Sequence, residues 1–129
     1  MVAIVGILSL QGNYIQHKNI FNKLNYDCSL VRYPSELKGC KLLILPGGES
    51  TAISKQIKRN GFLKAIKDFS KSGHIFGTCA GMILMSSADK TKHVESMEIM
   101  NFDIIRNAYG SQISSFTGVV NLHFDKSYN

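Results

Sequence analysis

Gly77-Thr78-Cys79-Ala80-Gly81 is the stretch that decides the fold. It follows the apolar pair 75–76 and precedes the apolar run 82–85, which predicts that a strand ends and a helix begins around the cysteine. A glycine two residues to either side of one nucleophilic side chain is typical of a nucleophile elbow, here with sulfur in place of oxygen. The start of a helix also favours the thiolate of Cys79. A tight turn around a buried thiol fits the pentapeptide equally well, so both interpretations stay open.

A second glycine-rich turn, Pro46-Gly47-Gly48-Glu49-Ser50-Thr51, directly follows the apolar run 41–45. Adjacent glycines let the backbone approach a ligand closely and leave N–H groups free to point at it. Ser50 or Thr51 can cap the helix that follows. An ordinary strand-to-helix loop has the same composition. Together with the cysteine elbow, however, the turn predicts an oxyanion hole of backbone N–H donors, which attack by a thiolate requires.

The rest of the chain alternates buried-strand patterns with one-sided apolar stripes, which predicts an α/β fold with a mainly parallel sheet. The first strand ends in Gln11-Gly12, at the edge where ligands of open α/β sheets bind. Strands are expected at 2–10, 28–33, 41–45 and 74–76, with mixed strand character at 97–105 and a further strand region at 116–124. Helices are expected from 13 to 24, from about 50 to 59, from 62 to about 72, and over 82–88.

Composition limits the class of protein. The 129 residues are 44% hydrophobic and 19% charged, as expected of one folded, soluble domain over residues 1–129. No window approaches the roughly 18 apolar residues of a membrane span, and the N-terminus reads as a strand and not as a signal peptide. Three cysteines without metal-type spacing indicate reduced thiols in the cytoplasm, with no metal and no cofactor.

The net charge of +6 raises the question of a nucleic-acid partner. Six basic residues interleave with apolar residues at helical spacing, without stacking aromatics: Lys55, Lys58, Arg59, Lys64, Lys67 and Lys71. A solvated helix face explains them better than a nucleic-acid surface does, while docking onto an acidic partner stays open. Among the histidines, His17 is expected to be surface or half-buried, and His74 should lie at the strand end opposite Cys79.

Four segments resemble one family. They are Leu8-Ser9-Leu10-Gln11-Gly12 with His17; Pro46-Gly47-Gly48-Glu49-Ser50-Thr51; Gly77-Thr78-Cys79-Ala80-Gly81; and Arg106-Asn107-Ala108-Tyr109-Gly110-Ser111-Gln112 with Ser115-Phe116. This pattern is similar to that of the glutaminase subunits of pyridoxal 5'-phosphate synthase, which are class I (triad) glutamine amidotransferases. The resemblance covers nearly all of the chain. It implies a flavodoxin-like, three-layer α/β fold.

The resemblance also implies an activity, partners and roles for residues. L-glutamine would be hydrolysed to glutamate and ammonia through a thioester on Cys79, and the ammonia would pass to a synthase subunit that builds pyridoxal phosphate. The backbone N–H groups of Ala80 and of the Gly47-Gly48 turn would hold the oxyanion, with Gln11 supporting that turn where the synthase subunit docks. Four residues match glutamine-binding positions: Gly48, Glu49, Ser50 and Arg106.

One part of the family pattern is missing from the sequence. The family completes its triad with a histidine and a glutamate in a His-Pro-Glu segment, and none of the four histidines here precedes Pro-Glu. We therefore expect a C-terminally truncated, incomplete domain, a weak or inactive glutaminase, and an exposed apolar sheet edge. Two alternatives stay open: a non-catalytic docking partner of the synthase subunit, and another cysteine-elbow hydrolase.

Overall fold

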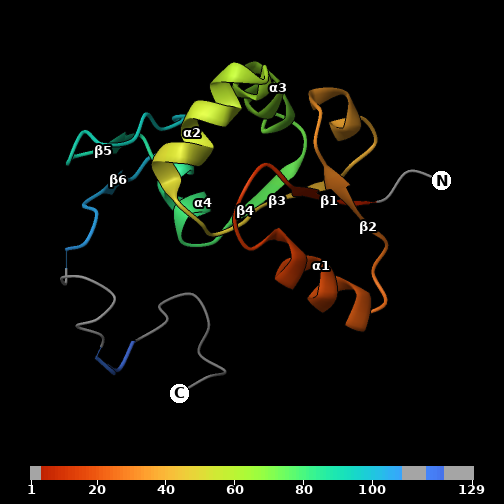
Figure 1. The fold of residues 1–129 in the computed structure, drawn as a ribbon, viewed down its shortest axis with the longest axis horizontal. Coiled ribbons are helices and arrows are strands. Elements are labelled where there is room, and N and C mark those ends of the chain that lie inside the picture. Colours follow the sequence, from red (N-terminus) through yellow and green to blue (C-terminus); the bar gives the residue numbers. More distant parts are fainter. Residues whose placement is uncertain (1–3, 109–115, 121–129) are drawn as a thin grey trace.

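The sheet has four parallel strands in the order β2-β1-β3-β4 (Figure 1). The computed structural model describes residues 4–108 and 116–120. The strands are β1 (Val5–Leu8), β2 (Cys28–Val31), β3 (Leu42–Leu45) and β4 (His74–Gly77). Every pairing is parallel, so the predicted parallel sheet is confirmed. The order 2-1-3-4 is that of the flavodoxin-like arrangement.

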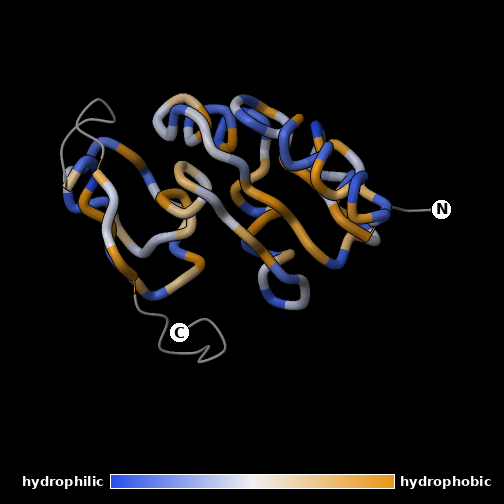
Figure 2. Tube along the Cα trace, turned by 90° about the horizontal axis from the view of Figure 1, so that it is seen from below, coloured by the Kyte–Doolittle hydropathy of each residue, from blue (hydrophilic) through white to orange (hydrophobic). Residues whose placement is uncertain are grey.

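Helices cover both faces of this sheet and complete three layers (Figure 1). Helix α1 (Tyr14–Lys23) packs on one face, over a small core of Val5, Ile7 and Ile44. The other face carries the short helix η1 (Pro34–Leu37), α2 (Ser50–Arg59), α3 (Phe62–Phe69) and α4 (Ala80–Met85) over the main core. Figure 2 shows the apolar residues gathered along the inner strands, as expected when helices cover both faces.

The predicted helix over 82–88 is wrong at its end. Helix α4 stops at Met85, and Ala88–Asp89 instead forms strand β5, which pairs in parallel with β6 (Asp103–Ile104). The cause is tertiary. The N–H of Met97 donates to the carbonyl of Leu84, and those of Ile99 and Met100 donate to the carbonyl of Met85. The incoming chain thus satisfies carbonyls that a longer helix would have used.

The predicted strand character beyond residue 96 holds for only two residues. Within 97–105 the structure has a strand at Asp103–Ile104 alone. The N–H groups in the first part of this stretch bond to the last carbonyls of α4 and not to another strand. Residues 116–120 have no regular secondary structure, which corrects the expected strand there. The rest of that region, 121–124, lies outside the described residues, as do 109–115 and His123.

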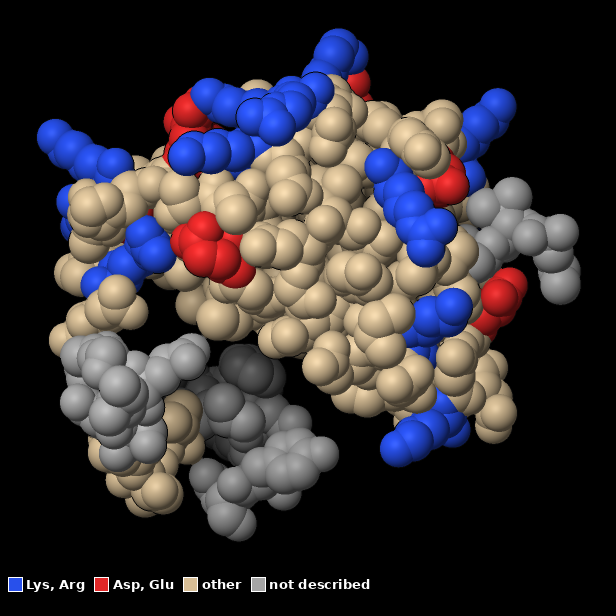
Figure 3. Space-filling model, viewed as in Figure 1, with Lys and Arg blue, Asp and Glu red and all other residues tan. Residues whose placement is uncertain are grey.

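The basic residues of α2 and α3, with Lys71 just after α3, lie on a solvent-exposed face, as the helical spacing predicted (Figure 3). Several are paired with acidic neighbours. Lys58 contacts Glu95, and Lys64 and Lys71 both contact Asp68. Opposite charges are therefore mixed along this face. None of the helices in the described part of the chain is long and apolar enough to span a membrane.

Candidate active site

Cys79 lies in the turn between β4 and α4, at a strained backbone position. Its φ of 52° and ψ of −111° place a non-glycine residue in a region that costs about 1–3 kcal/mol unless surrounding contacts enforce it. The thiol is free and the residue is exposed. The carbonyl oxygen of Cys79 accepts from the N–H of Ile83, so α4 starts directly after it. The turn therefore presents the thiol outward at the start of a helix.

The two glycines of the elbow are needed because backbone packs against both. A β-carbon on Gly81 would lie 2.0 Å from the carbonyl oxygen of Leu45, at the end of β3. A β-carbon on Gly77 would lie 2.7 Å from the carbonyl carbon of Gly81. Real β-carbons do not approach other atoms so closely. The first turn of α4 thus rests directly on the ends of β3 and β4, which fixes where Cys79 sits.

The Pro46-Gly47-Gly48 turn lies beside the elbow. A β-carbon on Gly47 would lie 3.4 Å from that of Cys79. The two turns lie close together because of the sheet: β3 and β4 pair through Leu45 and Gly77, and each turn begins where its strand ends. The N–H of Thr78 also donates to the carbonyl of Leu45 at 3.1 Å. The sheet therefore brings the predicted oxyanion turn and the predicted nucleophile together.

The turn after β1 packs against the other side of the diglycine turn. The N–H of Asn13 donates to the carbonyl of Gly47 at 2.9 Å, and Gly12, with φ of 94°, contacts the same peptide. The side-chain oxygen of Gln11 is buried there, and none of the described residues donates a hydrogen bond to it. Gln11 thus directly precedes Gly12, which contacts the predicted oxyanion turn, and its side-chain oxygen is an unused acceptor among the described residues.

Glu49 and Arg106 approach each other at the start of α2. The Glu49 carboxylate accepts from the N–H groups of Ala52 and Thr51, at 2.7 and 3.0 Å, and so caps the helix. These two hydrogen bonds, helped by the Arg106 cation at 3.9 Å, hold the pKa of the Glu49 carboxyl below its ordinary value. Ser50, the first residue of α2, is buried. The carboxylate of Glu49 is therefore engaged with its own helix and with Arg106.

Sequence reasoning missed the contact that His17 makes with the elbow. His17 is half-buried, as expected, but its Nε2 lies 3.1 Å from the hydroxyl oxygen of Thr78, beside Cys79. The helical spacing held a signal: His17 stands three residues after Tyr14 and four before Phe21, and both of these pack against the sheet. His17 therefore shares their inward face.

Of the other histidines, the two that the structure describes lie away from the elbow. His74 is exposed and begins β4, so it occupies the strand end opposite Cys79, as predicted. His93 lies in the loop after β5, where its N–H donates to Asp89. Across residues 4–108 and 116–120, no group of three histidine, cysteine or acidic side chains could hold a metal ion.

Comparison with known proteins gives a consistent family. The SNO glutamine amidotransferase family matches residues 7–127. The chain is 41% identical over 113 residues to the pyridoxal 5'-phosphate synthase subunit PdxT of Methanocaldococcus jannaschii, covering 88% of this chain and 59% of that protein. It is 35% identical over 127 residues to the PdxT subunit of Fervidobacterium nodosum, covering 97% of this chain and 66% of the relative.

Solved structures agree on the fold. A crystal structure of a glutamine amidotransferase superposes with a TM-score of 0.80 at 35% identity, covering 88% of this chain and 61% of that one. A peptidase E protein from Listeria monocytogenes superposes with a TM-score of 0.65 at 14% identity, a likeness of fold alone. The chain thus spans about three-fifths of the length of the relatives it matches.

Proposed function

Because the chain belongs to the SNO glutamine amidotransferase family, we propose that it is the glutaminase component of a pyridoxal 5'-phosphate synthase. The observation that carries this proposal is the exposed thiol of Cys79, held at positive φ beside the Gly47-Gly48 turn. The substrate would be L-glutamine, and the products would be glutamate and ammonia. A cytoplasmic location fits the three free thiols.

In the proposed reaction the Cys79 thiolate attacks the side-chain carboxamide carbon of glutamine. A carbon–sulfur bond forms, and the carbonyl electron pair moves onto oxygen. The backbone N–H groups of Ala80 and of the Gly47-Gly48 turn stabilise this oxyanion, because both lie beside the thiol. The intermediate collapses as the amide nitrogen takes up a proton and leaves as ammonia. Water then cleaves the thioester, which releases glutamate and restores the thiol.

The amino-acid end of glutamine would be held at the start of α2. The Arg106 guanidinium suits the substrate α-carboxylate, since it can donate two parallel hydrogen bonds. Glu49 would keep Arg106 in place while capping α2, and Gly48 and Ser50 would contribute the backbone of the pocket wall. The Glu49 carboxylate is anionic at neutral pH, and its lowered pKa keeps it so in more acidic solution, so it also suits the substrate ammonium group.

Proton transfer sets the expected rate. The 129 residues contain no His-Pro-Glu segment, and the histidine nearest the elbow among the described residues bonds to Thr78. A positioned general acid or base contributes about 10²–10⁴ in rate. We therefore propose that the 129-residue chain by itself is a weak or inactive glutaminase with a reactive nucleophile. It would dock on its synthase partner around Gln11, whose side-chain acceptor is unused among the described residues.

The test is covalent labelling with 6-diazo-5-oxo-L-norleucine, a glutamine mimic that alkylates the attacking thiol. Mass spectrometry of peptides should find the label on Cys79, and excess L-glutamine should protect it. The Cys79→Ser variant should take up no label. Ammonia release should be far slower than that of a PdxT subunit assayed alongside. Labelling that ignores glutamine, or that falls equally on Cys28, would overturn the proposal.

A non-catalytic docking partner is the second candidate, favoured by the lack of a histidine bonded to Cys79 among the described residues. It predicts a different pair of results. The chain would co-purify with a PdxT-dependent synthase subunit, yet Cys79 would resist the glutamine mimic. Labelling together with co-purification would support the glutaminase instead.

A further inference from the structure

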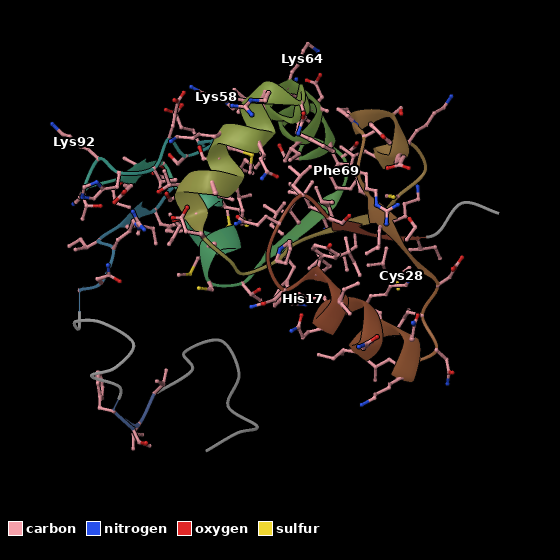
Figure 4. All side chains as sticks on the ribbon, in the orientation of Figure 1. His17, Cys28, Lys58, Lys64, Phe69 and Lys92 are labelled. Carbon is pink, nitrogen blue, oxygen red and sulfur yellow. The ribbon has the colours of Figure 1, made fainter. Side chains whose placement is uncertain are left out.

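The geometry points to a role for His17: we propose that it is a positioning residue for Cys79, acting through Thr78. The inference rests on the proposed function only in taking Cys79 as the reacting residue. Its foundation is the 3.1 Å contact between His17 Nε2 and Thr78 Oγ1, which joins residues 61 positions apart. Figure 4 labels His17 in the first half of α1. The contact therefore ties a helix on one face of the sheet to the elbow.

Thr78 is the residue through which the elbow can be held. Its N–H donates to the carbonyl of Leu45, and its carbonyl accepts from the N–H of Gly81 at 2.9 Å. These two bonds fix its backbone between β3 and α4. The hydrogen bond to His17, on α1, also restricts rotation of the Thr78 side chain. Since Cys79 follows at a strained φ of 52°, its orientation depends on how firmly Thr78 is held.

His17 is itself firmly placed. Tyr14 and Phe21, on the same face of α1, pack against the core of Val5, Ile7 and Ile44. The N–H of Asn13, just before α1, holds the carbonyl of Gly47. The start of α1 therefore contacts both sides of the candidate site, the diglycine turn through Asn13 and the elbow through His17. This arrangement sets the spacing between thiol and oxyanion turn.

The assignment is to positioning and not to proton transfer. The imidazole nitrogen that reaches the elbow contacts the hydroxyl of Thr78 and not the Cys79 sulfur. Threonine serves this contact well, since its branched side chain has few rotamers and its hydroxyl can either donate or accept. A serine at the same position would keep the hydroxyl, whereas a valine would keep the shape and lose the bond.

A double-mutant cycle tests the proposal with the whole 129-residue chain. The variants are His17→Leu, Thr78→Val and the double mutant, with Thr78→Ser as the conservative variant and His74→Leu as the matched control. The readout is the rate at which iodoacetamide alkylates Cys79 at fixed pH, followed by peptide mass spectrometry. This rate needs no glutamine turnover, so failure of the proposed glutaminase activity would appear separately.

Each single substitution should slow alkylation of Cys79 by about three- to tenfold, the range expected for one hydrogen bond. The double mutant should be no slower than the slower single mutant, because both remove the same contact. Thr78→Ser and His74→Leu should react at the wild-type rate. Unchanged or faster alkylation in the single mutants, or effects that multiply in the double mutant, would overturn the proposal.

Two further measurements separate positioning from a general loss of structure. Buried Cys40 serves as an internal reporter, because a loosened fold would expose it to alkylation. Its rate should stay unchanged in His17→Leu while that of Cys79 falls. NMR of the imidazole nitrogens should show a shifted His17 signal in Thr78→Val and an unshifted His74 signal. An unshifted His17 signal would refute the contact itself.

Discussion

Gly12 and Gly47 meet backbone to backbone, so closely that a β-carbon on Gly12 would lie 2.0 Å from the carbonyl oxygen of Gly47. Gly12 belongs to the turn after β1, and Gly47 to the turn after β3. The two strands are neighbours in the sheet, and their turns leave its carboxyl edge together. This contact lets the N–H of Asn13 bond to the Gly47 carbonyl, and it fixes the Gly47-Gly48 turn against the start of the first helix.

Gly12→Ala should therefore disrupt the candidate site as well as the fold. A side chain at φ of 94° is strained, and its β-carbon would also displace Gly47. Gly61→Ala is the matched control, because Gly61 has φ of 75° and open space around it. We expect losses in unfolding free energy of about 3 kcal/mol for Gly12→Ala and about 1 kcal/mol for Gly61→Ala. Urea denaturation measures both, and equal losses would show that crowding at Gly12 is unimportant.

The Glu49 cap should contribute stability that depends on pH. Its pKa is lowered in the folded chain, so the stabilisation is present above the unfolded value of about 4.3 and is lost as pH falls through the folded value. Glu49→Gln should cost about 0.5–1 kcal/mol at neutral pH, a modest figure because the side chain is half exposed. The difference from wild type should shrink in acid. Exposed Glu98→Gln is the control, and an equal loss there would contradict the capping role.

Asp89 organises the loop between β5 and the segment that caps α4. One carboxylate oxygen accepts from the N–H and hydroxyl of Thr91, and the other accepts from the N–H groups of His93 and Val94. Burial alone would raise the pKa of Asp89, but these hydrogen bonds outweigh it and the pKa is lowered. The loop delivers Val94 and Met97 to the main core, so Asp89 supports packing at a distance.

Asp89→Asn should destabilise the chain by about 2 kcal/mol at neutral pH, because an amide NH₂ replaces one acceptor and leaves N–H groups unpaired. Since the folded pKa is lowered, the wild-type advantage should fade below the ordinary aspartate value of about 3.9. Asp103→Asn, at an exposed ion pair with Lys90, should change stability by less than about 0.5 kcal/mol. Thermal unfolding measured across a range of pH tests this prediction. If the stability difference between wild type and Asp89→Asn persisted in acid, the account would be contradicted.

The parts of the fold that could be predicted depend on local sequence patterns, and the parts that could not depend on contacts with residues elsewhere in the chain. Continuous apolar runs predict four buried parallel strands, and glycine-rich turns after two of them predict where β3 and β4 end. The neighbourhood of Gly47 and Cys79 follows from parallel pairing alone. The early end of α4 depends on Met97, which arrives from a distant loop. The bond between His17 and Thr78 likewise depends on a partner 61 residues away, which no local pattern reveals. The catalytic and binding roles stay predictions.

The three thiols should separate by rate of alkylation. Burial raises the pKa of Cys28, which the Lys18 cation opposes to a smaller extent and the Asp27 carboxylate reinforces. Burial also raises the pKa of Cys40. Both therefore hold less thiolate at neutral pH than an ordinary cysteine, and their alkylation rates should keep rising above a pH of about 8.5, where that of an ordinary thiol levels off. Exposed Cys79 should react first, and Cys79→Ser should remove the fast phase. In urea all three should react alike. If Cys40 were labelled before Cys79 in the folded chain, the burial of Cys40 would be contradicted.

The outer edge of β4 should drive self-association of the 129-residue chain. Among the described residues β4 pairs with β3 alone, and its residues are exposed or half-buried whereas β1 is fully buried. An apolar groove of about 440 Å³ runs along this edge, between β4, α4 and the segment before β6, and is lined by Ile75, Phe76, Gly77, Met82, Met85, Met100 and Phe102. Unpaired strand groups beside apolar side chains are a template for another chain.

Phe76→Lys should therefore keep the chain monomeric up to a higher protein concentration, because a charge on an edge strand opposes pairing. Analytical sedimentation measures this concentration. Phe76 is 55% exposed, and Ile20, on α1 away from this edge, is 54% exposed. Ile20→Lys removes as exposed an apolar side chain and adds the same charge, so it controls for solubility in general. We expect Ile20→Lys to associate as the wild type does. If both variants dissociate equally, net charge and not the β4 edge governs association.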